Sequence, residues 1–170
     1  AGMLMRRSDA RHRRIAVIGA GAAGLCCAKY LVQDGFEDVT IYEIGTQIGG
    51  LWCYQNDNGL SSAYRTLHIN TARDLTNFSD LRFDDDVQMF PDHRDMHRYL
   101  IAYAQKFDLM RRIRFSSRVI DLRPAAGYSR DAPRWQVRLE DGSAEEFDRV
   151  VVATGHLSKP LHVPHFRDGF

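Results

Sequence analysis

The stretch IAVIGAGAAG, residues 15–24, passes from a short apolar run into a turn rich in glycine. The run is rich in β-branched residues and predicts a buried strand. Residues from Ala22 to about Gln33 predict a helix with an apolar face, and Gly35 is expected to end it. Residues 38–43, DVTIYE, predict a second strand. A strand, a glycine turn, a helix and a strand make one βαβ unit, whose strands are parallel.

The three glycines of the turn form the pattern G-x-G-x-x-G directly between a strand and a helix. Gly19 allows the tight turn, Gly21 lets a pyrophosphate approach the backbone, and Gly24 lets the helix and strand pack closely. Glu43 follows Gly24 by 19 residues, at the end of the second predicted strand, where an acid accepts hydrogen bonds from a ribose. Because an acid repels a 2′-phosphate, the pattern predicts a site for FAD or NAD and not for NADP. The alternative is an ordinary tight turn.

Length and composition are those of a single globular domain. The 170 residues suffice for one core, and 44% hydrophobic and 26% charged residues are ordinary for such a domain. The net charge of +1 gives no sign of nucleic-acid binding, and no apolar run approaches the roughly 20 residues that span a bilayer. Residues 1–13 are expected to be a disordered basic tail that starts with the remnant of an expression tag. A nucleic-acid or membrane-binding arm is the alternative.

The cysteine and histidine positions argue against a disulfide framework and a metal site. Cys26, Cys27 and Cys53 contain no C-x-x-C pair, and their odd number favours a reducing compartment, so we expect the cytoplasm. His93 and His97 lie four residues apart in a predicted helix but have no carboxylate or cysteine partner at motif spacing. We expect this pair on an exposed helix face, and no metal.

The remaining segments complete an α/β pattern. Residues 45–91 are irregular and polar, and a loop of this length in a compact domain is usually functional. Residues 92–107 predict a helix that begins after Asp92 as its N-cap. Strand-like runs follow at 117–124, 134–140 and 145–155. A tight-turn signal, Asp141-Gly142, joins the second and third runs, and the closing RVVVATG is expected to return to the parallel sheet.

Taken in order, the motifs resemble the flavin-containing monooxygenases, the class B flavoprotein monooxygenases, from Arg14 to the end of the chain. The resemblance rests on VIGAGAAGL, IYE, IGGLW, AYRTLHINTARDLTNFSDLRF, YLIAYAQKFDL, IRFSSRVIDL and ATGHLSKPLHVP. It implies a Rossmann-like FAD-binding domain of the α/β class, with a parallel sheet, helices and a three-stranded antiparallel β-meander. Residues 14–170 are then the N-terminal part of that domain, which is incomplete at the C-terminus.

The resemblance also implies cofactor contacts, residue by residue. Residues 19–23 line the FAD pyrophosphate, and Glu43 binds the adenosine ribose. Leu51 and Trp52 pack on the FAD. Asn70 lies beside the reactive edge of the isoalloxazine, which makes it the catalytic candidate.

Further positions lie nearer the second cofactor and the adenine. Ile69 and Asn70 match positions near the nicotinamide cofactor, Val119 matches a contact to adenine, and Thr154 and Gly155 close over the FAD. The full set that the resemblance implies is Gly19, Ala20, Gly21, Ala22, Ala23, Gly24, Glu43, Leu51, Trp52, Ile69, Asn70, Thr71, Val119, Thr154 and Gly155.

The activity implied is NADPH-dependent oxygenation of soft N or S atoms of small molecules by O2, through a flavin peroxide adduct, with FAD and NADP as cofactors. A non-catalytic FAD- or adenine-dinucleotide-binding module is the alternative, as is a Baeyer–Villiger or N-hydroxylating relative. Ala22 stands where N-hydroxylating enzymes tend to have proline, and CYQNDNG follows Trp52 where Baeyer–Villiger enzymes tend to have Tyr-Pro-Gly. Both differences favour the flavin-containing monooxygenases.

The sequence departs from the family at its C-terminal side. The family motif F-x-G-x-x-x-H-x-x-x-F/Y is expected to begin at Phe170, where the sequence ends. We therefore expect the NADPH domain on a downstream or separate polypeptide. Self-association into a homo-oligomer is left open.

Overall fold

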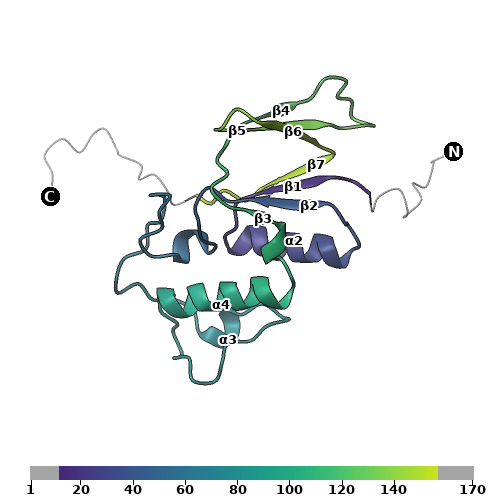
Figure 1. Cartoon of the computed structure of the whole chain (residues 1–170). Coiled ribbons are helices and arrows are strands. Elements are labelled where there is room, and N and C mark those ends of the chain that lie inside the picture. The colour runs from purple at the N-terminus through teal and green to yellow at the C-terminus, as the bar shows by residue number, and fades with distance from the viewer. Residues whose placement is uncertain (1–11, 157–170) are drawn as a thin grey trace, which may run out of the picture.

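A computed structural model of the chain describes residues 12–156. Its centre is a four-stranded parallel sheet in the order β3-β2-β1-β7 (Figure 1). The strands are β1 (Ile15–Ile18), β2 (Val39–Tyr42), β3 (Ile113–Arg114) and β7 (Arg149–Val152). The predicted βαβ unit and the return of the last run to this sheet are therefore confirmed. The expected N-terminal tail lies almost entirely outside the described residues, and so does the expected start of the motif at Phe170.

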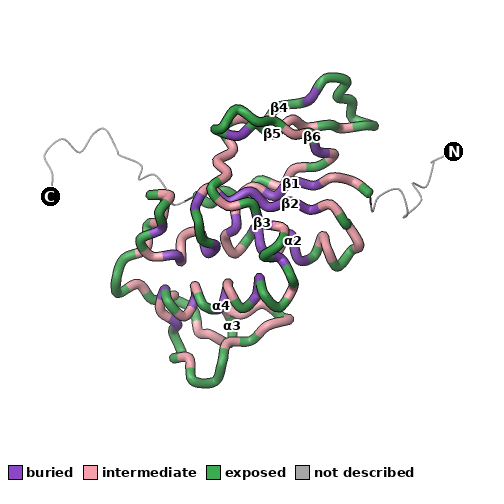
Figure 2. Tube along the Cα trace, viewed as in Figure 1, coloured by how far each residue is buried: buried purple, intermediate pink, exposed green. Residues whose placement is uncertain are grey.

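Two helices lie on one side of the sheet. α2 (Ala22–Gln33) packs under β1 and β2, and α4 (His93–Lys106) packs against α2 (Figure 1). Their apolar faces and the central strands share one core, shown as the buried segments of Figure 2. Its fully buried members include Val17, Leu25, Ile41, Leu100 and Tyr103. α2 ends just before Gly35, which adopts a φ of 92°, and α4 begins just after Asp92, its N-cap, as the sequence predicts.

The other side of the sheet is covered by an antiparallel meander. It consists of β4 (Val119–Pro124), β5 (Trp135–Leu139) and β6 (Ala144–Phe147), in the order β4-β5-β6. Gly142 turns the chain between β5 and β6 at a φ of 89°, as the Asp-Gly signal predicts. The third strand-like run is divided: its first part is β6 and its second part is β7. The predicted combination of a parallel sheet, helices and a three-stranded meander is confirmed.

Polar contacts join the meander to the sheet at its inner face. The Tyr42 hydroxyl of β2 donates to the carboxylate of Glu145 on β6 across 3.1 Å. Glu145 also pairs with Arg14 and Arg114, and burial, together with the negative charge of Glu145, raises the pKa of Tyr42 to about 12. Tyr42 therefore stays protonated, and its ring packs edge-on against Phe147. The contact links the end of β2 to the meander.

The long middle segment is irregular, as predicted, but it is held in place. It contains only η1 (Gly50–Trp52) and α3 (Arg73–Thr76), and η2 (Met110–Arg112) follows α4. Lys29 of α2, buried apart from 3% of its side chain, pairs with Asp80 of the segment. The Tyr99 hydroxyl of α4 accepts the N–H of Phe78 and donates to the carbonyl of Leu81, each across 2.7 Å. Both helices therefore anchor this segment.

The expectation of an exposed His93 and His97 is wrong. His93 is only 3% exposed, and its Nε2 lies 3.2 Å from the carbonyl oxygen of Arg65. His97 is half-buried, and its Nε2 lies 2.9 Å from the carbonyl oxygen of Ile48. The irregular segment folds over the first turns of α4, so loop residues cover the face of the helix that carries His93 and His97.

Candidate functional site

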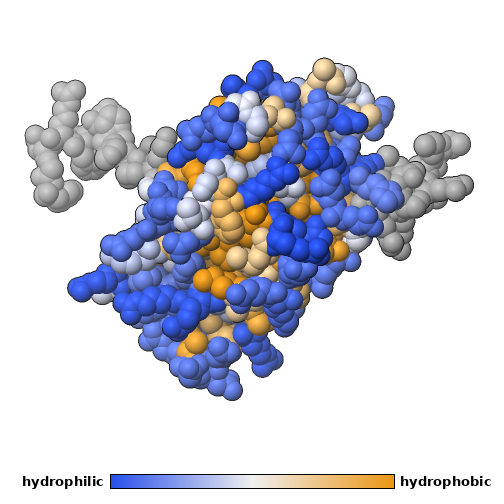
Figure 3. Space-filling model, in the orientation of Figure 1, coloured by the Kyte–Doolittle hydropathy of each residue, from blue (hydrophilic) through white to orange (hydrophobic). Residues whose placement is uncertain are grey.

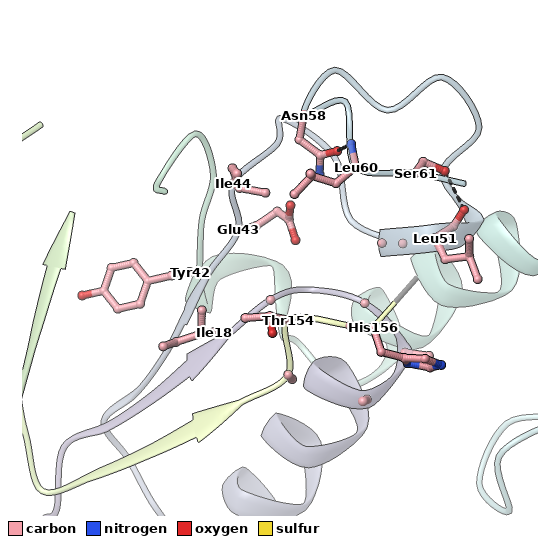
Figure 4. A pocket seen from close by; sticks show the side chains of 18 of the residues that line it. Ile18, Tyr42, Glu43, Ile44, Leu51, Asn58, Leu60, Ser61, Thr154 and His156 are labelled. Carbon is pink, nitrogen blue, oxygen red and sulfur yellow. Dashed lines mark hydrogen bonds between the residues drawn. The ribbon is translucent and has the colours of Figure 1, made fainter. Parts of the chain in front are cut away.

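A cavity of about 630 Å³ opens at the carboxyl ends of β1, β2 and β7 (Figure 4). This edge of a parallel sheet is where open α/β folds bind ligands. The cavity is walled by the first glycine turn, by η1 and the loop after it, and by the segment that leads into β4. Its size falls within the range of about 300 to 1,000 Å³ typical of small-molecule sites.

The first glycine turn combines two structurally required glycines with one open position. A Cβ on Gly19 would lie 2.4 Å from the carbonyl oxygen of Ala153, and the φ of Gly19 is 107°. A Cβ on Gly24 would lie 1.9 Å from the carbonyl oxygen of Gly19. At Gly21 the nearest atom to such a Cβ is the Cα of Gly50, at an ordinary 3.7 Å. Packing therefore requires Gly19 and Gly24, whereas the missing side chain of Gly21 leaves space on the cavity side.

The N-terminus of α2 faces this space without a side-chain cap. Gly21 is the N-cap residue, and no side chain accepts a hydrogen bond from the first turn. Gly21, Ala22 and Ala23 all line the cavity. The first N–H groups of a helix have no intrahelical partner and carry partial positive charge, so they favour an anionic ligand. The turn therefore fits a pyrophosphate group, as the sequence predicts.

Glu43 is a buried carboxylate at the end of β2. It is 3% exposed, its Oε2 accepts the N–H of Ala20 across 2.8 Å, and its Oε1 accepts the N–H of Gly45 across 2.9 Å. Figure 4 shows the carboxylate directed into the cavity, whereas the Tyr42 ring is directed away from it. Because a carboxylate oxygen can accept more than one hydrogen bond, both oxygens keep capacity for ribose hydroxyls. Glu43 thus has a structural role that sequence reasoning missed.

A second glycine turn packs against the first. Gly49 and Gly50 have φ values of 116° and 55°, and the N–H of Gly49 donates to the carbonyl of Ala20 across 3.0 Å. A Cβ on Gly50 would lie 3.2 Å from the Cα of Gly21. This approach is tight for a side chain at position 50, whereas a Cβ on Gly21 would make only an ordinary contact of 3.7 Å with Gly50, so the contact favours glycine at position 50 and not at position 21.

The loop after η1 supplies lining residues that the sequence did not reveal. Asn58, Leu60 and Ser61 border the cavity, and the Ser61 hydroxyl donates to the carbonyl of Leu51 across 2.8 Å (Figure 4). Arg118, just before β4, borders it as well. The run NDNG at 56–59 indicates a turn, but nothing in its pattern says where that turn folds.

Most residues predicted to touch a cofactor border the cavity. Those that do so are Gly19, Gly21, Ala22, Ala23, Glu43, Leu51, Trp52, Val119, Thr154 and Gly155. Ala20 and Gly24 are buried behind the turn. Ile69, Asn70 and Thr71 do not border the cavity, and Asn70 and Thr71 are exposed. Cofactor contacts at all of these positions stay predictions.

The cavity region offers binding groups and no activated thiol. Cys53 is buried behind the second turn, and burial raises the pKa of its thiol, with a further contribution from the charges of Asp57 and Glu43. At neutral pH this thiol stays protonated and is a poor nucleophile.

Within residues 12–156, no three His, Cys, Asp or Glu side chains are placed to hold a metal ion. The same part of the chain has no helix long and apolar enough to cross a membrane.

Comparison with known proteins assigns the family. The model of the family described as "Flavin-binding monooxygenase-like" matches residues 12–167. The chain belongs to this family. Flavin-containing monooxygenase 5 of Rattus norvegicus is 36% identical over 157 residues, which cover 89% of this chain and 29% of the relative. The resemblance seen in the sequence is confirmed.

Solved structures agree with the flavin-binding monooxygenase-like assignment. The S-allyl-L-cysteine S-oxygenase of Allium sativum has a TM-score of 0.77 and 30% identity, and the match covers 89% of this chain and 38% of that one. A structure of OTEMO in complex with FAD and NADP has a TM-score of 0.70 at 24% identity, covering 89% of this chain and 27% of that one, and shows the same fold. The chain thus spans under two fifths of each of these three proteins.

Proposed function

We propose that the cavity binds FAD and that the chain forms the FAD-binding part of an NADPH-dependent monooxygenase. One observation carries the proposal: Gly21 leaves space beside the uncapped N-terminus of α2, with Glu43 buried at the end of the neighbouring strand. A diphosphate and a ribose are the two groups that such a pair would hold. Membership of the flavin-binding family supports FAD as the dinucleotide.

Each part of the site has its own task in this proposal. The N–H groups at the start of α2 hold the pyrophosphate, and the Glu43 carboxylate accepts the ribose hydroxyls. Leu51 and Trp52 offer apolar contact on the η1 side, and Thr154 and Gly155 border the cavity at the end of β7. When bound, FAD supplies the redox chemistry, while the protein holds and shields it.

We propose that the substrates are small molecules with a soft S or N atom, which O2 oxygenates at the expense of NADPH. The similarity to an S-allyl-L-cysteine S-oxygenase supports a sulfur atom as the site of oxygenation.

We also propose that Asn70 acts in catalysis and that Ile69 to Thr71 contact the cofactors. The sequence has one glycine fingerprint, so the second dinucleotide is expected to be held by other polypeptide. The three free cysteines support a reducing location, which we propose to be the cytoplasm.

Titration of the 170-residue chain with FAD and with NADP+ tests the proposal. FAD is expected to be retained through gel filtration near one equivalent, and to slow hydrogen exchange of residues 19–24 more than NADP+ does. The Glu43 charge is the reason, because it repels the 2′-phosphate of NADP+. Greater protection by NADP+ would show that the ligand is assigned wrongly.

A second measurement separates an enzyme from a binding module. The chain is given FAD, NADPH and a simple thioether or tertiary amine, and NADPH consumption and oxygenated product are followed. The proposal predicts sustained, coupled turnover only when polypeptide corresponding to the rest of a relative is added. A chain that binds FAD and stays inactive under every such condition would favour the non-catalytic module.

A further inference from the structure

His97 of α4 has a contact that neither its helix position nor the family assignment explains. Its Nε2 lies 2.9 Å from the carbonyl oxygen of Ile48, the residue before the second glycine turn. Because a carbonyl oxygen only accepts, Nε2 carries the proton and donates. A side chain of α4 therefore holds the entry to a turn that borders the cavity.

The ring also packs directly on that turn. A Cβ on Gly49 would lie 2.7 Å from Cδ2 of His97, so the ring occupies the space where a side chain would be. Gly49 and Gly50 both have positive φ, and glycine backbone is unusually free to move when nothing restrains it. His97 is thus a restraint on a turn that contains two consecutive glycines.

The restraint continues into the first glycine turn. The N–H of Gly49 donates to the carbonyl of Ala20, and the N–H of Ala20 donates to Glu43 across 2.8 Å. One series of hydrogen bonds therefore runs from α4 through both turns to the end of β2. The Ala20 carbonyl belongs to the peptide group that joins Ala20 to Gly21. The position of this group therefore sets the position of Gly21 beside the N-terminus of α2.

We propose that His97 is a positioning residue of the cofactor site: it fixes the second glycine turn against the first and thereby sets the affinity for FAD. This inference rests on the proposed function for the identity of the ligand. Without the ring, the turn would have more conformations to lose on binding, and a ligand has to offset that loss. His97 acts through the backbone of Ile48 and Gly49, not by contact with the ligand.

His93 provides a matched control one helical turn earlier. It is the more buried of the two, and its Nε2 also approaches a carbonyl oxygen, that of Arg65, at 3.2 Å. Its ring packs against Tyr54, with centroids 4.9 Å apart, and not on a glycine turn. Replacing His93 should therefore cost stability as much as replacing His97 does, without disturbing the cavity.

The experiment compares the wild-type chain with His97→Ala, His97→Gln and His93→Ala. FAD affinity is measured from flavin fluorescence, and hydrogen exchange at the Gly49 amide is measured without FAD. His97→Ala should weaken FAD binding about tenfold, the usual scale of one hydrogen bond, and speed Gly49 exchange. His97→Gln should recover part of both, since its amide N–H can reach the same carbonyl. His93→Ala should lower Tm yet keep FAD affinity within about twofold.

Several results would overturn the inference. If FAD affinity is unchanged in His97→Ala, or is weakened equally in His93→Ala, His97 contributes to the stability of the fold and does not position the cofactor site. Unchanged exchange at the Gly49 amide would show that the ring does not hold the turn. If the wild-type chain bound no FAD, the proposed function would fail, while the exchange measurement would still decide whether His97 restrains the turn.

Discussion

At the residue scale, the glycines of the first turn differ in why they are glycine. Gly19 and Gly24 avoid collisions with carbonyl oxygens of the protein itself, at 2.4 and 1.9 Å from a Cβ, whereas Gly21 avoids none. The φ of Gly21, −80°, also suits any residue. A glycine that the fold does not require is best explained by a ligand that approaches it.

Gly21→Val tests this distinction. The variant should fold with a Tm close to wild type but lose FAD binding by at least about a hundredfold, because its branched side chain would project into the space for the pyrophosphate. Gly19→Ala is the comparison: its φ of 107° and its clash with Ala153 should destabilise the fold by several kcal/mol, of the order expected for strain and overpacking. Thermal unfolding and FAD titration of both variants separate the two effects. FAD bound normally by Gly21→Val would refute the assignment of the turn.

At the element scale, α4 begins with a reciprocal capping box. Asp92 accepts the N–H groups of Arg94 and Asp95, at 2.7 and 2.9 Å, and the Asp95 carboxylate accepts the N–H of Asp92 at 3.1 Å. Burial opposes the charged form of Asp92, but these backbone hydrogen bonds outweigh it and lower its pKa. The cap thus fixes the start of the helix that carries His97.

Asp92→Ala should lower the free energy of unfolding by about 1 kcal/mol at pH 7. A carboxylate with a lowered folded pKa stabilises the fold above its unfolded pKa, about 3.9, and this contribution is lost as the pH falls through the folded value. The difference between wild type and variant should therefore shrink at pH 3 and below. Urea unfolding at several pH values measures it, with Asp86→Ala in the exposed loop as a control expected within about 0.5 kcal/mol. A difference that does not change with pH would mean that the charge of Asp92 is not what caps α4.

Elements with a regular pattern were predictable from the sequence, and the loop was not. The β1-α2-β2 unit has apolar periodicity, a glycine turn and a stop, and each of these acts over a few residues. The cover over His93 and His97 comes from residues 48–65, whose path depends on anchors distant in sequence, such as Lys29 to Asp80. The cavity residues on strands and glycine turns could be predicted, because local sequence patterns place them. Leu60, Ser61 and Arg118 also line the cavity, but no local pattern places them there.

At the scale of the whole molecule, polar groups border an apolar band across one face (Figure 3). Several large apolar side chains in the described part of the chain are exposed, among them Leu75, Met89 and Val152 at 83%, 66% and 63%. A ligand that binds only the folded form stabilises it by an amount set by the ligand concentration and Kd. A bound dinucleotide is therefore expected to affect the whole domain and not the cavity alone.

FAD at a hundred times its Kd should stabilise the folded chain by about 2.7 kcal/mol. For a domain of this size that corresponds to a rise in Tm of roughly 5 to 11 °C. NADP+ at the same concentration should raise Tm by much less, because of Glu43, and FAD should raise the Tm of Gly21→Val by no more than about 2 °C. Differential scanning fluorimetry measures all three. A larger rise with NADP+ than with FAD would contradict the assignment of the cavity.

The position of β7 has a consequence for how the protein is made. β1 pairs in register with β7, beginning with Ile15 beside Arg149, 134 residues later. At about 5 to 20 residues per second, a ribosome needs roughly 7 to 27 s to synthesise the chain between them. During that interval one side of β1 has no strand to pair with, although β2 follows it almost at once. A nascent chain of this protein therefore carries, for several seconds, a strand edge whose backbone N–H and C=O groups are unpaired, and this is the interval in which a chaperone would have to protect it.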